Sequence, residues 1–130
     1  MATIRHHARI DASPDQVWAI ISDAGAIGDW APGIGSVEWN GTTRTIDMGG
    51  LKIAEEVVTS DDDLRRFQYK ITDAPMPFGY HLATVDVFKD GDGDGTFLVY
   101  SCEVEPDEAA DLMSPVLAGL VDSLKARAES

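Results

Sequence analysis

Four polar residues interrupt apolar stretches of the sequence, and their side chains have the chemistry of a binding or catalytic site. They are Glu55, Tyr69, His81 and Tyr100. In each case apolar residues stand two positions away, and residues two apart point to the same face of a strand. We therefore expect the four side chains to face one apolar interior. A carboxylate, an imidazole and two phenols in such a place could hold the polar end of a small molecule or exchange a proton with it.

Glu55 is the most informative of the four, because a carboxylate on an apolar face is costly when it has no partner. Such a group must be protonated, paired with a cation, or reached by water or a ligand. Two other interpretations stay open. Arg44 could form an ion pair with Glu55 at the wall of the interior, or the strand register could differ by one residue, which would turn Glu56 inward instead.

The other three residues have structural roles as their commoner alternative. His81 could act as an acid or base near neutral pH, or serve only as a hydrogen-bonding group at a cavity mouth. Buried tyrosines are more often core aromatics than catalysts. We assign no catalytic residue and keep Glu55 and His81 as candidates. The predicted ligand-binding set joins the four polar residues to five apolar ones: Glu55, Tyr69, His81, Tyr100, Phe67, Val85, Leu98, Val116 and Leu120.

The elements that must position these residues follow from the periodicity of the chain. Residues 3–11 alternate between apolar and polar side chains, which predicts a half-buried strand. Ser13-Pro14-Asp15-Gln16 has the residues of a capping box with proline at the first helical position, so a helix begins there. Glycines before Trp30 divide the segment that follows, and we expect two short helices joined by a bend.

Residues 34–105 have the pattern of six consecutive antiparallel strands joined by turns. Asn40-Gly41 favours a type I′ hairpin turn, and Gly49-Gly50 predicts the next turn. The acidic runs 61–63 and 90–94 are expected to be solvated turns. A longer connection at 73–78 contains Pro75 and Pro77. Its apolar Met76, Phe78 and Tyr80 could form a gate over a cavity or pack against Trp30.

The last segment, residues 106–130, is a predicted helix with one broad apolar face. That face comprises Ala109, Leu112, Met113, Val116, Leu117, Leu120, Val121 and Leu124. An antiparallel sheet of seven strands curls strongly, and a long amphipathic helix laid in its concave side would cover the apolar face. The sequence thus predicts an α+β domain, with a curved seven-stranded sheet around a C-terminal helix and two short helices between strands 1 and 2.

Composition limits the classes of function and partner. The 130 residues are expected to form a single domain, 1–130, which we expect to be a monomer or a weak homodimer. A net charge of −13 disfavours nucleic acid and anionic membrane surfaces as partners. The single Cys102 and an N-terminus without an apolar core favour a reducing cytoplasm. Apolar runs fall short of the roughly 20 residues that cross a bilayer, so we expect no integral membrane contact.

We predict no metal and no cofactor, because the motifs that suggest them fail on inspection. The acidic run 90–94 resembles the start of an EF-hand loop, but the twelfth position is Ser101 and the flanks have the pattern of strands. His6 and His7 are adjacent on a strand and face opposite sides, so they cannot bind one metal together. Cys102 is expected to be a small inward filler.

Five segments in order carry a resemblance to a known superfamily. They are IDASPDQVWAIISD at 10–23, the W-x-P-x-I of Trp30, Pro32 and Ile34, the strand of Glu55 running into DDDLRRFQYKI, VYSCEVEP at 99–106, and VLAGLVDSLK in the last segment. On these residues the chain resembles the START/Bet v 1-like (SRPBCC) superfamily, in its polyketide cyclase/dehydrase and lipid-transport branch. At the position of Tyr100 that family frequently has tryptophan, so we expect a cavity here to have a different shape.

The resemblance implies a helix-grip fold with a cavity for a hydrophobic or amphipathic small molecule, and a contact between Glu55 and a ligand or ordered water. It implies no particular chemistry. Three functions follow as hypotheses: a binding protein for a lipid or polyketide-like molecule, a polyketide cyclase or dehydratase that uses the same cavity, and an interaction module with a filled cavity. We favour the first, because the sequence contains no recognisable pair of mutually activating groups.

Overall fold

The computed structural model describes residues 1–76 and 78–130, so Pro77 of the predicted 73–78 connection lies outside the described residues. The elements, in chain order, are β1 (Ala2–Ile10), α1 (Pro14–Ser22), the 3-10 helix η1 (Ala24–Asp29), β2 (Ser36–Trp39), β3 (Thr43–Met48), β4 (Leu51–Asp61), β5 (Arg66–Asp73), β6 (Tyr80–Lys89), β7 (Thr96–Glu105) and α2 (Ala109–Glu129). The predicted order of elements is confirmed.

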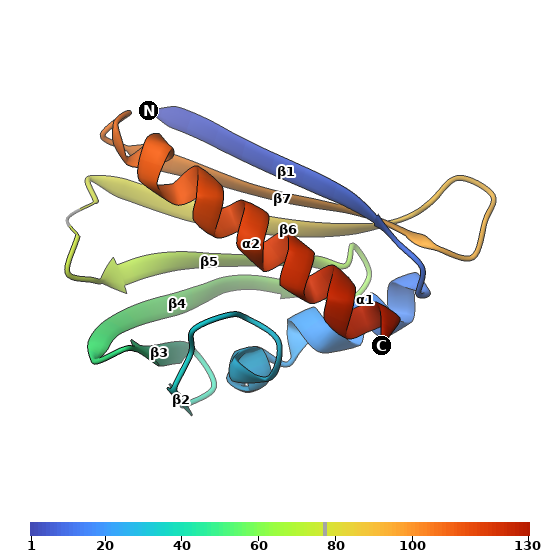
Figure 1. Cartoon of the computed structure of the whole chain (residues 1–130), viewed down its shortest axis with the longest axis horizontal. Helices are drawn as coiled ribbons and strands as arrows, with labels where there is room; N and C mark the ends of the chain where they lie inside the picture. The colour runs from blue at the N-terminus through green and yellow to red at the C-terminus, as the bar shows by residue number, and fades with distance from the viewer. Residues whose placement is uncertain (77) are drawn as a thin grey trace.

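Within the described residues, all seven strands form one antiparallel sheet in the order β1-β7-β6-β5-β4-β3-β2. The sheet curls, and α2 lies diagonally across its concave side, as Figure 1 shows. The short helices α1 and η1 lie at the lower edge of the same side in that view. The helix α2 packs mainly on β1 and β7. The predicted α+β architecture, a curved sheet wrapped around a C-terminal helix, is therefore confirmed.

The start of α1 follows from the capping box that the sequence predicts. The Ser13 hydroxyl accepts from the Gln16 backbone N–H at 3.2 Å, and the Gln16 side chain accepts from the Ser13 N–H at 3.0 Å. Two N–H groups at the helix start thereby gain partners. Val17, Trp18 and Ile21 are buried on the inner side of the helix. A local motif has thus placed one wall of the interior.

One turn departs from its predicted type. Asn40-Gly41 joins β2 to β3 as expected, but Gly41 alone of the two has a positive φ. The Asn40 side chain instead accepts the backbone N–H groups of Thr42 and Thr43, at 2.9 and 2.8 Å. The type I′ prediction for this turn is therefore wrong. Gly49 and Gly50, with φ of +61° and +90°, have the two positive values that a type I′ turn requires.

The apolar face of α2 is narrower than predicted. The helix begins at Ala109, and its buried residues are Ala109, Met113, Leu117, Val121 and Leu124. Leu112 and Val116 are 61% and 47% exposed, so the expectation that they lie on the buried face is wrong. The buried strip of α2 faces β1 and β7. Leu112 and Val116 each stand one position before a residue of that strip, so their side chains point to the flank of the helix beside it. Leu120 on that flank is half-buried against the helix η1 side of the core.

The turn between β4 and β5, which contains the acidic run 61–63, also makes contacts with α1. Trp18 of α1 donates its indole N–H to the Asp62 carboxylate at 2.8 Å, and Arg65 forms an ion pair with Asp15 at 2.7 Å. These two contacts attach α1 to the turn between β4 and β5.

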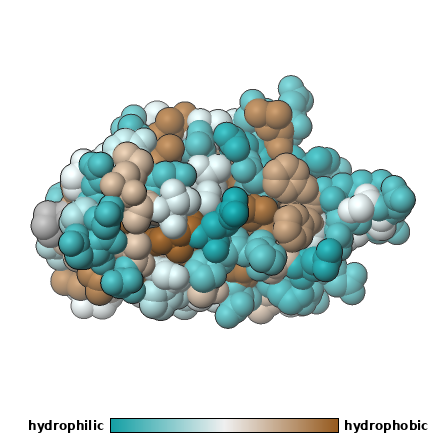
Figure 2. Space-filling model, turned by 90° about the horizontal axis from the view of Figure 1, so that it is seen from above, coloured by the Kyte–Doolittle hydropathy of each residue, from teal (hydrophilic) through white to brown (hydrophobic). Residues whose placement is uncertain are grey.

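Figure 2 shows another face of the molecule, seen from above, where hydrophilic residues cover most of the surface and hydrophobic ones form smaller groups between them.

Candidate functional site

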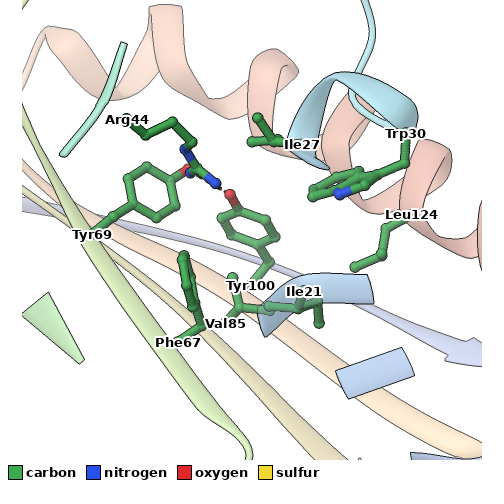
Figure 3. A pocket seen from close by; sticks show the side chains of 9 residues that line it. All are labelled: Ile21, Ile27, Trp30, Arg44, Phe67, Tyr69, Val85, Tyr100 and Leu124. Carbon is green, nitrogen blue, oxygen red and sulfur yellow. Dashed lines mark hydrogen bonds between the residues drawn. The ribbon is translucent and has the colours of Figure 1, made fainter. Parts of the chain in front are cut away.

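A small internal pocket lies where the sheet, the short helices and α2 meet (Figure 3). Its walls come from every layer of the fold and are mostly apolar; they are formed by Ile21, Ile27, Trp30, Arg44, Phe67, Tyr69, Val85, Tyr100 and Leu124. The volume open to the centre of a water-sized molecule is about 10 Å³. That is about the space that a single water molecule needs. In this conformation the pocket is therefore close to filled by the protein's own side chains.

The polar wall of the pocket is built on an ion pair between two neighbouring strands. Arg44 of β3 and Glu55 of β4 stand directly opposite each other in the antiparallel register. The Glu55 Oε1 atom accepts a hydrogen bond from Arg44 Nε at 2.8 Å, and it lies 2.7 Å from Arg44 Nη2 in the ion pair. The side chains of both residues are almost fully buried. A third Arg44 nitrogen, Nη1, donates to the Ala24 carbonyl at 3.1 Å, which connects the pair to η1.

This geometry decides between the alternatives for Glu55. Its pairing with Arg44 is confirmed, whereas the shifted register is wrong, because Glu56 is exposed. Burial raises the pKa of Glu55, and the Arg44 charge opposes that rise without cancelling it. Glu55 does not line the pocket itself. Its carboxylate pairs with the guanidinium of Arg44, which does line the pocket.

Two aromatic residues surround the Arg44 guanidinium. Its central carbon lies 5.2 Å from the ring centre of Tyr69 and 5.7 Å from that of Phe67. At these distances the ring faces attract the cation, which offsets part of the loss of solvation. Arg44 is thus held by a carboxylate, a backbone carbonyl and two rings at once.

The hydroxyl groups of Tyr69 and Tyr100 form a hydrogen bond to each other inside the pocket. Figure 3 shows the two hydroxyl groups and the Arg44 guanidinium pointing toward one another. Burial raises the pKa of both phenols above their ordinary value. Both tyrosines are therefore neutral at physiological pH, and they act as hydrogen-bonding groups there and not as bases.

His81 lies outside the pocket and has a structural contact of its own. Its Nδ1 atom accepts the backbone N–H of Ile71 at 3.0 Å. The ladder between β5 and β6 ends at Tyr69 and Ala83, so the imidazole replaces a backbone partner where the two strands separate. Its ring packs 5.4 Å from the ring centre of Phe78. Burial lowers the pKa of His81 from 6.5 to about 4, so the imidazole is neutral at physiological pH.

The predicted binding residues fall into three groups. Phe67, Tyr69, Val85 and Tyr100 line the pocket together. Glu55, His81, Leu98 and Leu120 do not line it, although Leu98 is fully buried in the core beside it. Val116 is exposed on α2, away from the buried strip. In the 73–78 connection, Phe78 packs against the core, whereas Met76 is exposed; a gate there stays a prediction.

The predicted ligand-binding set did not include several pocket residues, although signals for two of them were present. Arg44 stands two positions before the buried Ile46 on β3, so the alternation of that strand already turned its side chain inward. Trp30 belongs to the W-x-P-x-I motif, yet its role as a wall depends on how η1 folds back over the sheet. Ile21, Ile27 and Leu124 have no feature in the sequence that distinguishes them from other core residues.

Other classes of site find little support in the described part of the chain. It contains no group of three or more His, Cys, Asp or Glu residues placed to hold a metal ion. Cys102 is buried, and burial raises the pKa of its thiol to about 12. In that part of the chain, no helix combines the length and the hydropathy that crossing a membrane requires.

Comparison with known protein families gives one match over nearly the whole chain. The family model described as polyketide cyclase / dehydrase and lipid transport matches residues 1–129. No curated protein matches the sequence closely enough to support a relationship.

Several solved structures have the same fold. The protein XoxI from Bacillus cereus is 26% identical, with a TM-score of 0.90 over 98% of this chain and 96% of that chain. A START superfamily protein from Mycobacterium smegmatis is 19% identical, with a TM-score of 0.81 over 98% of this chain and 97% of its own. Norcoclaurine synthase from Thalictrum flavum, in complex with dopamine and hydroxybenzaldehyde, is 21% identical, with a TM-score of 0.76 and coverages of 97% and 85%. At such identities the last two show the fold alone.

Proposed function

The chain belongs to the polyketide cyclase/dehydrase and lipid-transport family, and from that premise we propose that it binds a small hydrophobic or amphipathic molecule in the pocket between the sheet, η1 and α2. The observation that carries the proposal is the convergence of Arg44, Tyr69 and Tyr100 on one wall of an otherwise apolar pocket. Ligand sites in proteins have this composition, with a few convergent polar groups among apolar ones. The polar wall would orient the ligand, and the apolar walls would cover the rest of it.

Binding requires the pocket to widen, because its present space is that of about one water molecule. The helix η1 is the wall best suited to move. It is a short 3-10 helix with a non-helical residue, Ala26, inside it, and it supplies Ile27 to the pocket. Trp30 follows directly after it. A ligand would displace Ile27 and Trp30 outward, while the sheet and α2 stay in place, as in other complexes that form by a local rearrangement.

The test combines native mass spectrometry with a variant that fills the pocket. Mass spectrometry of the freshly purified protein is expected to show a retained small molecule, or binding of an added neutral dye such as Nile red. Val85→Phe adds volume at a buried pocket position and should abolish dye binding; Val58→Phe makes the same change at a residue that is 49% exposed and should not. Folding of both variants is checked by thermal unfolding. Equal binding by a folded Val85→Phe protein would exclude this pocket.

An interaction module is the second candidate, and the small size of the pocket favours it. A core with room for only one water needs no ligand to be complete. On this interpretation the outer surface makes the functional contacts, and the Arg44–Glu55 pair is structural. The same experiment separates the two functions, since a module with a filled core would retain no small molecule and bind no dye.

A polyketide cyclase or dehydratase is the third candidate. Tyr69 and Tyr100 are two titratable groups in contact inside the pocket, which is the arrangement that acid–base catalysis would need. Because burial raises the pKa of both, they would polarise a substrate carbonyl as neutral donors and would not abstract a proton. Conversion of an added poly-ketone by the wild type, lost in Tyr100→Phe, would support catalysis over binding alone.

A further inference from the structure

The Arg44 guanidinium has more hydrogen-bond donors than the surrounding protein uses. An arginine side chain carries five N–H groups. Two of them make hydrogen bonds, the one on Nε to Glu55 and one on Nη1 to the Ala24 carbonyl. The Nη2 atom lies 2.7 Å from the same Glu55 oxygen in the ion pair, which engages at most one of its two N–H groups. One N–H on each terminal nitrogen is left without an acceptor among residues 1–76 and 78–130. Since Arg44 lines the pocket, an acceptor atom placed there can take these donors.

The tyrosine pair adds a further donor to the same place. One hydroxyl group donates to the other, and the second then has a hydrogen for which the described part of the chain shows no acceptor. Figure 3 places both hydroxyl groups beside the Arg44 guanidinium. The polar wall of the pocket thus has an excess of donors, so the complementary ligand atom is an acceptor oxygen and not an ammonium or amine group.

The charge of the wall distinguishes a neutral acceptor from an anionic one. Glu55 already compensates the positive charge of Arg44, so the buried cluster of Arg44, Glu55 and the two neutral tyrosines has a net charge of about zero. A carboxylate entering the pocket would bring an uncompensated charge into a site that excludes water, which is costly. A carbonyl oxygen can accept the same hydrogen bonds without that cost.

The space in the pocket fits one such atom. The volume of about 10 Å³ is close to what one water oxygen occupies, so an acceptor oxygen can lie there while the remainder of the ligand displaces Ile27 and Trp30. Resting on the proposed binding function, we infer that the ligand is an uncharged apolar molecule with a carbonyl oxygen, which Arg44 and the Tyr69–Tyr100 pair bind by hydrogen bonds.

Four compounds of one shape test this inference: 2-acetonaphthone, 2-ethylnaphthalene, 2-naphthoate and 1-(2-naphthyl)ethylamine. They place a ketone, a hydrocarbon, a carboxylate and an amine on the same ring system. Their dissociation constants are measured near neutral pH by NMR titration of the isotope-labelled protein. We expect the ketone to bind about tenfold more tightly than the hydrocarbon, since a hydrogen bond to a charged donor contributes about that factor or more. The carboxylate and the amine should bind more weakly than the ketone.

Variants identify the residues responsible. The double variant Arg44→Met/Glu55→Leu removes both charges together and should reduce the preference for the ketone over the hydrocarbon to about one. The matched control, Arg66→Met/Asp86→Leu, removes a more exposed ion pair that takes no part in the pocket and should keep the preference. If the first double variant fails to fold, Tyr100→Phe, which changes no charge, is expected to reduce the preference several-fold.

The outcomes separate this inference from the proposed function. Equal binding of the ketone and the hydrocarbon, or tightest binding of the carboxylate or the amine, would overturn the inference and leave a binding function in place. An unchanged preference in both Arg44→Met/Glu55→Leu and Tyr100→Phe would also overturn it. If none of the four compounds binds, and no molecule is retained after purification, the binding function itself fails.

Discussion

At the scale of single residues, the contacts of Arg44 and Glu55 define the site. Each of the two charges is buried and is compensated mainly by the other. In such a pair the mutual attraction largely offsets the loss of solvation, so the net contribution of the pair to stability is small. The loss of one partner is a different matter, because it leaves a charge in the core with no counter-charge. The pair therefore constrains which single substitutions the pocket tolerates.

We predict that Glu55→Leu lowers the free energy of unfolding by about 3 to 5 kcal/mol, because it leaves Arg44 buried without its carboxylate. The double variant Arg44→Met/Glu55→Leu should regain most of this loss. Urea unfolding at pH 7 measures both. Asp86→Leu is the control, because it breaks a more exposed ion pair. The side chain of Arg66 in that pair is 43% exposed and that of Asp86 is 17% exposed, so the loss should cost about 1 kcal/mol or less. A Glu55→Leu cost no greater than that of Asp86→Leu would contradict the buried pair.

At the scale of elements, the separation of β5 and β6 is the feature that sequence patterns do not anticipate. Both strands continue beyond the pair of Tyr69 and Ala83, yet their ladder ends there. The imidazole of His81 accepts the N–H of Ile71, which would otherwise lose its partner in the sheet. The His81 side chain thus stabilises the place where β5 and β6 separate, which we call the seam between these strands. The protonation state of His81 therefore affects the stability of this seam.

Acid should weaken this seam. The folded state lowers the pKa of His81 from 6.5 to about 4, so it favours the neutral imidazole. The resulting stability is fully present above pH 6.5 and is lost as the pH falls toward 4, by up to about 3 kcal/mol. His81→Asn can accept the Ile71 N–H through its amide oxygen and does not titrate. Its loss of stability between pH 7 and pH 4.5, measured by urea unfolding, should be smaller than that of the wild type.

The control for this prediction is His7→Asn, which removes an exposed imidazole on the outer face of β1. It should lose stability in acid as the wild type does. An acid sensitivity of His81→Asn equal to that of the wild type would show that the seam between β5 and β6 does not depend on a neutral imidazole.

At the scale of the whole molecule, the sheet and α2 form two layers with a narrow line of contact. The buried strip of α2 packs on β1 and β7, and the neighbouring flank with Leu112 and Val116 is exposed. The pocket lies between these layers and η1, so its volume depends on how closely all three pack. Its size is a property of the assembled chain and of no single element.

Leu117→Ala and Leu112→Ala make the same change on the two sides of α2. Leu117 is 1% exposed and Leu112 is 61% exposed. We expect Leu117→Ala to cost about 2 to 5 kcal/mol of unfolding free energy, because it opens a cavity between the layers. Leu112→Ala should change stability by about 0.5 kcal/mol or less. Thermal and urea unfolding measure the difference, and similar costs at the two positions would mean that α2 packs differently against the sheet.

Local patterns in the sequence were sufficient for the order of elements and for much of the buried face. The alternation around Phe67, Tyr69, Val85 and Tyr100 predicted that these side chains point inward, and the capping box at Ser13 predicted the start of α1. Such signals are reliable because they depend on backbone geometry within a few residues. The resemblance to a known superfamily added the fold that these elements form, which the family match and the solved structures support.

The tertiary structure alone decided which side chains of different strands and helices come into contact. Sequence reasoning left open whether Glu55 pairs with Arg44, and it did not anticipate that Trp30 forms a pocket wall or that His81 completes the sheet. The exposure of Val116 and the small volume of the pocket also emerged only from the fold. These properties depend on strand register and on the packing of residues far apart in the chain, and local periodicity alone does not determine either.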